Sequence, residues 1–298
     1  MNDFHSFYYK KLKLCKIKFT EYLNLIKSSS VCWLQKYFFN DNIKGFFDVI
    51  SAIVDGIVSF IVLVLTFPPA LILIVGIIAW FSSKKWSFTI LSMIGLLFIL
   101  NLGYRQETMD TLALVLTSVL ISIIVGIPLG IWASQSEKKA RIITPILDFM
   151  QTMPAFVYLI PALFFFEIGV MPGVISSVIF AMPPTIRLTN LDIREVPADL
   201  VEAANAYGST TKQKLFKVQL PLATKTIMAG INQSIMLSLS MVVIASLAGA
   251  PRLGAEVYRA VSRLEVDTGF EAGISIIILA IILDRITQYF GNHSNQRA

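Results

Sequence analysis

The feature that most constrains this chain is a series of apolar segments, each about as long as a membrane is thick. A helix needs about 20 apolar residues to cross the hydrocarbon core of a bilayer. Six segments after residue 85 meet that length: 86–104, 108–134, 145–168, 172–191, 222–248 and 270–290. A chain that carries so many of them cannot fold as a water-soluble domain.

The composition supports this conclusion and also excludes intrinsic disorder. Hydrophobic residues make up 55% of the 298 residues and charged residues only 15%, against about 25% charged in an ordinary globular protein. A chain this apolar buries itself in protein or lipid instead of remaining unfolded in water. We therefore expect an all-α, polytopic membrane protein.

Cysteine and histidine are scarce, which excludes several kinds of chemistry. Cys15 and Cys32 match no metal-ligand or C-x-x-C spacing, and His5 and His293 lie in the terminal tails. We predict no catalytic residue and no metal site. The net charge of +6 is typical of a membrane protein that keeps lysine and arginine on its cytoplasmic side, so it does not indicate a nucleic-acid partner.

The first hundred residues predict a basic tail followed by amphipathic and membrane helices. Residues 1–45 contain eight lysines among aromatic residues, which indicates either contact with anionic lipid or a solvated tail that sets orientation. Apolar residues at spacings of three and four predict an amphipathic helix over 43–66. Pro68 and Pro69 interrupt the apolar stretch that follows, so this region crosses the bilayer once or twice. The total is about seven spans, or eight.

Lysine and arginine in alternate loops set the expected orientation. Most of them fall on one side, which we assign to the cytoplasm: Lys84, Lys85, Lys138, Lys139, Arg141, Arg194, Lys212, Lys214, Lys217 and the tail after Arg285. The loops on the other side are poor in positive charge, except 251–269, where three arginines are offset by acidic residues. The expected organisation is a tail at 1–45, N-terminal helices at 46–104, a core at 105–290 and a C-terminal tail at 291–298.

One cytoplasmic loop, 192–221, is too charged and too helical in character to be a simple connector. Val201, Ala204 and Tyr207 recur at helical spacing, and Leu215 and Val218 follow a glycine, so two short helices are predicted. Gly208 stands where a chain leaves a helix through positive φ, and Pro197 stands where a first helical turn accepts proline. We expect a compact helix-turn-helix that projects from the membrane.

The residues of this loop follow a fixed pattern. It reads Glu202-Ala203-Ala204, three residues, Gly208, nine residues and Val218-Gln219-Leu220-Pro221. This resembles the EAA loop of the permease subunits of bacterial ABC importers, with every fixed position matched. The resemblance implies a type I ABC importer permease fold in the inner membrane, and it implies that the loop docks into a groove of a cytoplasmic ATPase. The implied coupling residues are Glu202, Ala203, Ala204, Gly208, Val218, Leu220 and Pro221.

The resemblance also implies the partners of the chain. No G-x-x-x-x-G-K-[ST] phosphate loop occurs in the sequence, so ATP and Mg²⁺ are expected on a separate ATPase subunit and no cofactor in this chain. The expected assembly is a permease homodimer in membrane lipid, with two ATPase subunits on the cytoplasmic side and an external substrate-binding protein.

A narrower resemblance covers roughly 112–288. The stretches 111–117, 148–161, 216–221, 226–246 and 276–288 look like the permease of the glycine betaine/proline betaine importers. That family implies import of quaternary ammonium osmolytes, whose cation is held by aromatic faces in the external binding protein. At the outer turn 249–254, Pro251-Arg252 departs from the expected Gly-Gly-Leu-Gly pattern.

Polar and aromatic residues in two spans are candidates to line a transient substrate path. They are Met150, Gln151, Met153, Phe156, Tyr158, Asn232, Gln233, Ser234, Met236 and Ser238. Helix packing through small and polar residues is the alternative explanation for each. Asp148, Glu167, Arg187 and Asp284 lie near expected span ends, where helix pairing or snorkelling to the interface explains a charge.

Two other functions remain open. The same architecture could import choline, carnitine or proline, which a competition assay distinguishes. An ATP-independent channel or secondary carrier would transport without an ATPase partner, and the complete loop pattern argues against it.

Overall fold

The computed structural model describes residues 41–66, 76, 86–166, 168–250 and 252–293, and within these ranges the chain is helical and contains no strand. The expected basic tail at 1–45 lies mostly outside the described residues, as does the C-terminal tail beyond 293. Two compact units are formed by residues 1–52 and 53–298. The first is described only for residues 41–52, so the following concerns the second.

The N-terminal helices match two of the expectations. α2 spans Asp41–Thr66, which confirms the amphipathic helix that was predicted to end before Pro68. α4 spans Trp86–Asn101, three residues shorter than the expected span 86–104. A further crossing of the membrane between α2 and α4 would involve residues 67–75 and 77–85. These residues lie outside the described ranges.

Three long helices form the centre of the second unit: α5 (Arg105–Ser134), α8 (Val170–Glu195) and α11 (Leu220–Ser246). Glycines allow them to pack closely. A Cβ on Gly130 of α5 would lie 2.6 Å from Thr189 Cβ of α8, and one on Gly173 of α8 would lie 2.9 Å from Ala245 Cβ of α11. Small residues of this kind bring helix backbones together in membranes, so Gly126 and Gly130 serve packing within the chain.

The expected span 145–168 is not one continuous helix, because the structure breaks this region into two helices. α6 (Glu137–Thr152) and α7 (Ala155–Phe166) meet at an angle of 98°. Proline disfavours the helical conformation of the residue before it, and Met153, before Pro154, has an extended ψ of 134°. Pro154 also has no N–H for the Met150 carbonyl, which accepts the Tyr158 hydroxyl instead. The freed carbonyl is therefore satisfied within the bend.

The last two helices of the second unit are α12 (Leu253–Arg263) and α13 (Val266–His293). Leu264, between them, adopts a left-handed φ of 59°. α13 packs along α11 and also contacts α4, where a Cβ on Gly95 would lie 2.7 Å from Ile278 Cγ2. The expected loop 251–269 therefore contains a helix of its own.

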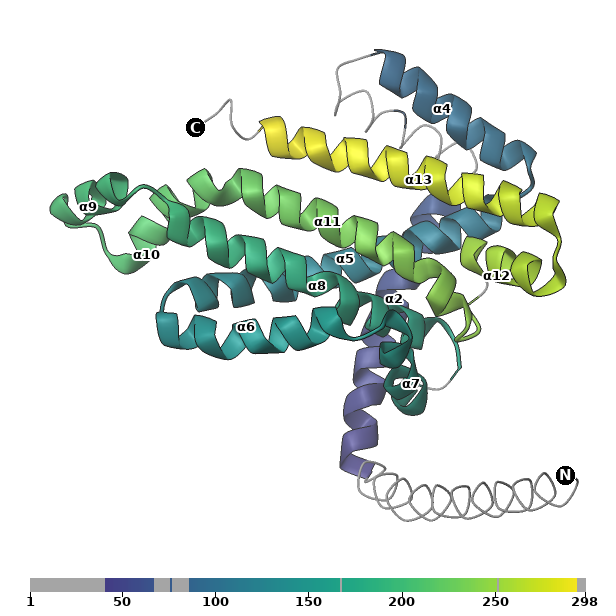
Figure 1. Ribbon diagram of the computed structural model, residues 1–298, viewed down its shortest axis with the longest axis horizontal. Helices are drawn as coiled ribbons and strands as arrows, with labels where there is room; N and C mark the ends of the chain where they lie inside the picture. Colours follow the sequence, from purple (N-terminus) through teal and green to yellow (C-terminus); the bar gives the residue numbers. More distant parts are fainter. Residues whose placement is uncertain (1–40, 67–75, 77–85, 167, 251, 294–298) are drawn as a thin grey trace, which may run out of the picture. The chain divides into compact units, whose positions relative to one another are not determined.

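Within the described residues, five helices are long and apolar enough to cross a membrane, or six if the bent pair is one span. The shorter apolar helix α4 brings the number of candidates to seven, which agrees with the expected minimum. α8 and α11 run side by side (Figure 1), with the loop helices α9 (Ala198–Ala206) and α10 (Thr211–Lys214) at one end and α12 at the other. The lysines of the first end mark it as cytoplasmic.

Candidate functional site

The loop 192–221 folds as the predicted pair of short helical segments around Gly208. Pro197 is the N-cap of α9 and lies just before its first turn. At the other end, Gly208 has φ +74°, and two bonds close the helix: Ser209 N–H donates to the Ala204 carbonyl at 3.0 Å and Gly208 N–H to the Asn205 carbonyl at 2.9 Å. This is the Schellman arrangement that positive-φ glycine permits.

The second helical segment differs from the expected short helix, because it has no break before the membrane span. Thr210 and Gln213 form a capping box at the start of α10. The chain then passes through a π-helical turn, η1 (Leu215–Gln219), in which Leu220 N–H donates to the Leu215 carbonyl. Helical structure therefore continues from Thr211 to Ser246. The π turn ends two residues before Pro221, whose missing N–H would disturb a regular α-helix.

The predicted coupling residues fall into two groups. Glu202, Ala203 and Gly208 are exposed on α9 and its turn, whereas Ala204 is buried against the rest of the loop. Val218, Leu220 and Pro221 lie at the base, in η1 and the first turn of α11. Only the first group therefore lies at the tip of the loop, where a partner can reach it.

Two aromatic residues of the loop were missed as site candidates. Tyr207 is 91% exposed and Phe216 is 64% exposed. Helical spacing groups Tyr207 with Val201 and Ala204, but Tyr207 is the C-cap of α9 and is exposed, whereas Ala204 is buried. Exposed aromatic residues beside small ones are typical of the central contacts of protein interfaces.

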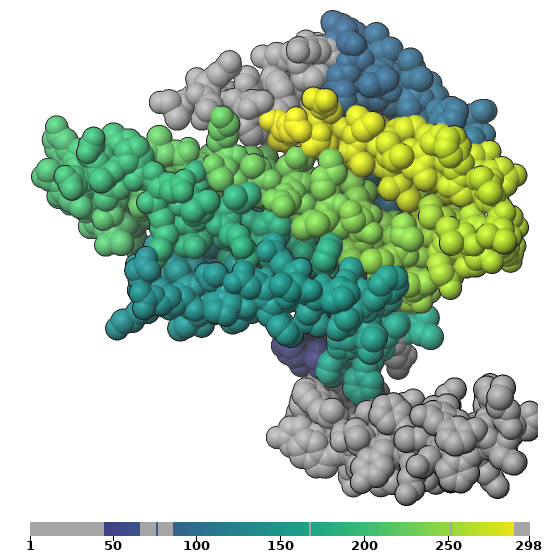
Figure 2. Space-filling view, in the orientation of Figure 1, coloured from purple at the N-terminus to yellow at the C-terminus, as the bar shows by residue number. Residues whose placement is uncertain are grey.

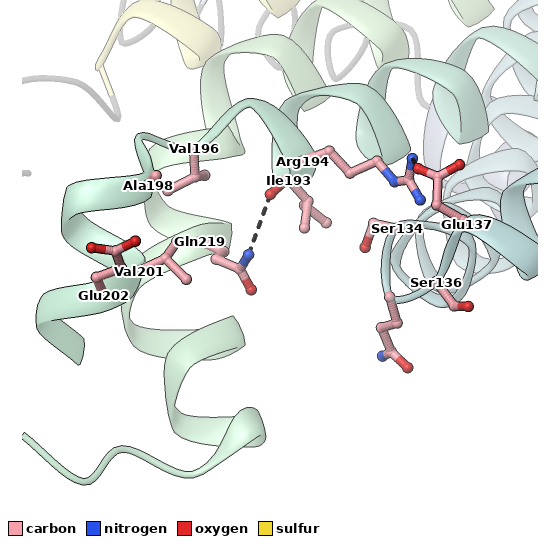
Figure 3. Close-up of a pocket in the computed structure, with 11 residues that line it drawn as sticks. Ser134, Ser136, Glu137, Ile193, Arg194, Val196, Ala198, Val201, Glu202 and Gln219 are labelled. Atoms are coloured by element: carbon pink, nitrogen blue, oxygen red, sulfur yellow. Dashed lines mark hydrogen bonds and ion pairs between the residues drawn. The ribbon is translucent and has the colours of Figure 1, made fainter. Parts of the chain in front are cut away.

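A pocket of about 520 Å³ separates α9 from the turn between α5 and α6. Figure 3 shows Val201 and Glu202 on one side and Ser134, Ser136 and Glu137 on the other. In the space-filling view, the loop end stands out beyond the spans (Figure 2).

Two polar contacts connect the walls of this pocket. Arg194, at the end of α8, forms an ion pair with Glu137 at the start of α6, with Nη1 and Oε1 2.7 Å apart. Gln219 Nε2 donates to the Ile193 carbonyl at 3.3 Å. The last turn of α8, which leads into α9, is thereby held to both α6 and the start of α11.

The substrate-path candidates on α11 divide between its two faces. Ser234 and Ser238 are fully buried, and Ser234 lies 2.8 Å from Thr185 Oγ1 and donates to the Ala181 carbonyl at 2.5 Å. Ser234 therefore packs against α8, and Ser238, four residues later, lies on the same face of α11. Gln233 is exposed and Met236 is partly exposed, on the opposite face.

The remaining candidates lie where α11 meets α13 and around the α6–α7 bend. Asn232 donates to Asp284 at 2.8 Å and accepts from Thr287 at 2.9 Å, so it clamps α11 to α13. Tyr158 is buried at the bend. Gln151 and Phe156 are exposed, and Met150 and Met153 are partly exposed.

At the opposite end of α11, one charged side chain is almost completely buried. Arg252, the N-cap of α12, is 2% exposed, and its Nε and Nη1 have no hydrogen-bond partner within the described residues. Burial lowers the pKa of Arg252 to about 10, and the negative charge of Asp110 on α5 opposes that shift. In the sequence, Arg252 stands out only as a departure from the expected turn and as one of three arginines in the loop 251–269.

Comparison with known proteins gives concordant matches. Residues 126–296, more than half of the chain, match the family model described as binding-protein-dependent transport system inner membrane component. The glycine betaine transport system permease protein OpuAB of Bacillus subtilis is 63% identical over 246 residues, covering 82% of this chain and 87% of that protein. The glycine betaine/proline betaine transport system permease protein ProW of Escherichia coli is 50% identical, covering 77% of this chain and 64% of that protein.

The fold also matches solved structures. A structure titled as an inward-facing conformation of the MetNI methionine ABC transporter aligns with a TM-score of 0.60 at 19% identity, covering 64% of this chain and 95% of that one. This likeness confirms the expected importer-permease fold, and the relatives confirm the expected resemblance to betaine permeases. The chain therefore belongs to the family of binding-protein-dependent transport system inner membrane components.

Proposed function

We propose that this chain is the membrane-spanning subunit of an ATP-driven importer that moves glycine betaine or proline betaine type osmolytes into the cytoplasm. The observation that carries the proposal is the exposed tip of the loop 192–221. It presents Glu202, Ala203 and Gly208 to a partner, and it is tied through Arg194 and Gln219 to α6, α8 and α11.

The chemistry of the tip suits docking into a cytoplasmic ATPase. Ala203 allows a partner surface to approach the helix backbone, and the Glu202 carboxylate can accept hydrogen bonds or face a cation. Tyr207 supplies a large apolar contact. Closure of the ATPase around nucleotide would move α9. The contacts with α6, α8 and α11 would transmit this movement, so that nucleotide binding shifts the conformational equilibrium of the membrane domain.

The names of the relatives support the substrate class. The protein from Listeria monocytogenes named as the glycine betaine/carnitine transport permease GbuB is 57% identical over 252 residues. A relative named for choline transport, OpuBB of Bacillus subtilis, is only 27% identical over 180 residues. A quaternary ammonium compound that also carries a carboxylate therefore fits better than choline, which lacks one.

Other chains would supply the remaining subunits of the transporter. ATP and Mg²⁺ would bind the ATPase subunit, and an external protein would deliver the substrate. A second copy of this chain would complete the path, because the α11 face with Gln233 and Ser240 is exposed. Polar residues at membrane depth face protein or water in preference to lipid.

The proposal is tested by uptake into proteoliposomes that contain this chain, its ATPase and its binding protein. Labelled glycine betaine should accumulate only with ATP on the ATPase side, and excess unlabelled choline should leave the accumulation intact. Carnitine is the informative second competitor. Uptake without the ATPase would show a carrier. If another ligand of the binding protein stimulates ATP hydrolysis and betaine does not, the chain is still the membrane subunit of an ATP-driven importer. In that case glycine betaine is not its substrate.

A further inference from the structure

Charges that face away from the core of a membrane protein need an explanation, and one pair of this kind joins α6 and α8. Arg187 Nη2 and Asp148 Oδ1 are 2.7 Å apart, and the two side chains are 44% and 55% exposed in the isolated chain. Both residues are expected near span ends from the sequence. Helix pairing is confirmed, and α8 continues to Glu195, beyond the expected span end at 191.

The depth of Arg187 follows from helix geometry. Arg187 is eight residues before the end of α8 at Glu195, which corresponds to about 12 Å along the axis. α8 is a candidate span of 26 residues, longer than the roughly 20 that a bilayer core requires. The ion pair therefore lies level with the inner half of the hydrocarbon core.

Lipid is not a suitable environment for this pair. Ionised side chains within membrane segments face the protein interior or a water-filled cavity, because the hydrocarbon cannot solvate them. Within the described residues, the Arg187 guanidinium bonds only to Asp148 Oδ1 and keeps other N–H donors, and the second oxygen of Asp148 has no hydrogen bond. The pair thus has unused binding capacity on its exposed side.

Other polar groups lie beside the pair on α6. Gln151 and Thr152, three and four residues after Asp148, share its face of the helix, and both are exposed. Two turns above Arg187 on α8, Phe180 packs against Tyr158 with ring centroids 6.3 Å apart. Charge, amide and aromatic groups therefore follow one another along the seam between α8 and the α6–α7 bend.

From this arrangement we propose that Arg187 and Asp148 form a transient site for a zwitterion on the translocation path, with the substrate carboxylate on Arg187 and the quaternary ammonium beside Asp148. The inference rests on the proposed function and names two of its substrate contacts. A zwitterion brings one charge of each sign, so it can replace the direct contact without leaving either side chain unpaired. Gln151 adds an amide donor for the carboxylate.

The test replaces the pair by apolar residues of similar size, Arg187→Met with Asp148→Leu, in proteoliposomes that hold the complete transporter. A pair that only joins helices can be replaced in this way with little loss of stability. A substrate site predicts that the maximal rate of glycine betaine uptake falls at least tenfold. The half-saturating external concentration should stay within twofold, because the binding protein sets it, and ATP hydrolysis stimulated by the loaded binding protein should persist.

The matched control is Glu256→Gln with Arg259→Met on α12, an ion pair of the same 2.7 Å length outside the spans. It should leave the uptake rate within twofold. Arg187→Lys provides a second test if the double variant does not fold, because it keeps the charge and loses the planar fork. Its maximal rate should fall at least threefold.

Each outcome has a separate meaning. Unchanged uptake in the double variant, or in Arg187→Lys, would overturn the site. A parallel fall of uptake and ATP hydrolysis would also overturn it, since that result indicates a structural role. Absence of betaine uptake by the wild-type transporter would instead reject the proposed function.

Discussion

The two ends of α11 are built in opposite ways. At the cytoplasmic end, the loop exposes Glu202 and 91% of Tyr207. At the outer end, Leu253 is fully buried, its N–H donates to Thr111 Oγ1 of α5 at 3.2 Å, and Gly169 N–H donates to the Ala248 carbonyl at 2.9 Å. The outer turn is thus bonded to other helices of the chain, whereas Glu202 and Tyr207 make no side-chain hydrogen bond or ion pair within the described residues.

This difference indicates where another protein is needed to complete the structure. Exposed aromatic and small residues contribute little to the stability of the isolated chain, so their substitution should affect assembly and transport. Buried residues at the outer turn determine whether the helices pack at all. Substitutions at the two ends should therefore change different measured quantities.

The largest expected effect is at the outer turn, for Gly254→Ala. A Cβ there would lie 2.4 Å from the Val242 carbonyl oxygen, and backbone atoms cannot move aside cheaply, so the cost is about 3 kcal/mol. The midpoint of thermal unfolding of the purified protein should fall by several degrees. Gly273→Ala on α13 is the control, because a Cβ there meets nothing within 4 Å. Equal melting of both variants would contradict the close packing.

At the cytoplasmic end, Glu202→Lys and Gly208→Pro should uncouple ATP hydrolysis from transport. Proline cannot adopt the φ of +74° found at Gly208, and it removes the N–H that closes α9. Betaine uptake should fall at least tenfold, while the protein remains in the membrane. Gly208→Ala is the milder control, since its cost is about 1 kcal/mol of backbone strain. Normal uptake in the proline and lysine variants would reject the coupling role.

A smaller effect is expected for Tyr207→Ala. Loss of one exposed aromatic anchor should weaken binding of the ATPase subunit about tenfold, which corresponds to about 1.4 kcal/mol, and should leave thermal stability unchanged. The measurement is a titration of the purified ATPase against the reconstituted chain. Tyr258→Ala on α12, 49% exposed, is the matched control at the other end. The same affinity loss in both variants would show that position along α11 does not matter.

The contrast between the ends also shows what the sequence alone could predict. Apolar length predicted α5, α8, α11 and α13 to within a few residues, because a bilayer fixes how long a span must be. The EAA pattern located the loop, and the positive φ of Gly208 followed from its place after α9. These features depend on local sequence.

Features that depend on neighbouring helices could not be predicted. The bend at Met153 requires that Tyr158 satisfy the carbonyl freed by Pro154, and many membrane prolines bend a helix far less. The exposure of Tyr207 depends on the Schellman turn that ends α9. The Arg187–Asp148 pair joins residues 39 apart in sequence, and nothing in either local segment identifies its partner.

The smallest effect on stability is expected for substitution of Arg252, in the outer turn. Burial lowers the pKa of Arg252 from its ordinary value to about 10, so the charged form costs folding free energy in the whole range below pH 10. That cost would be relieved only above pH 10, as the buried guanidinium loses its proton. Arg252→Met should therefore be as stable as the wild type or about 1 kcal/mol more stable.

Thermal unfolding between pH 6 and 9 gives the measurement for Arg252→Met, and the difference from the wild type should be constant across that range, because Arg252 stays protonated in both folded and unfolded chains. Asp110→Asn is the opposing control. It removes the carboxylate that partly compensates the buried guanidinium, so it should lower the unfolding midpoint. A strongly destabilised Arg252→Met variant would mean that the guanidinium is satisfied in the assembled transporter, and that the outer end of α11, like the cytoplasmic end, is completed by another chain.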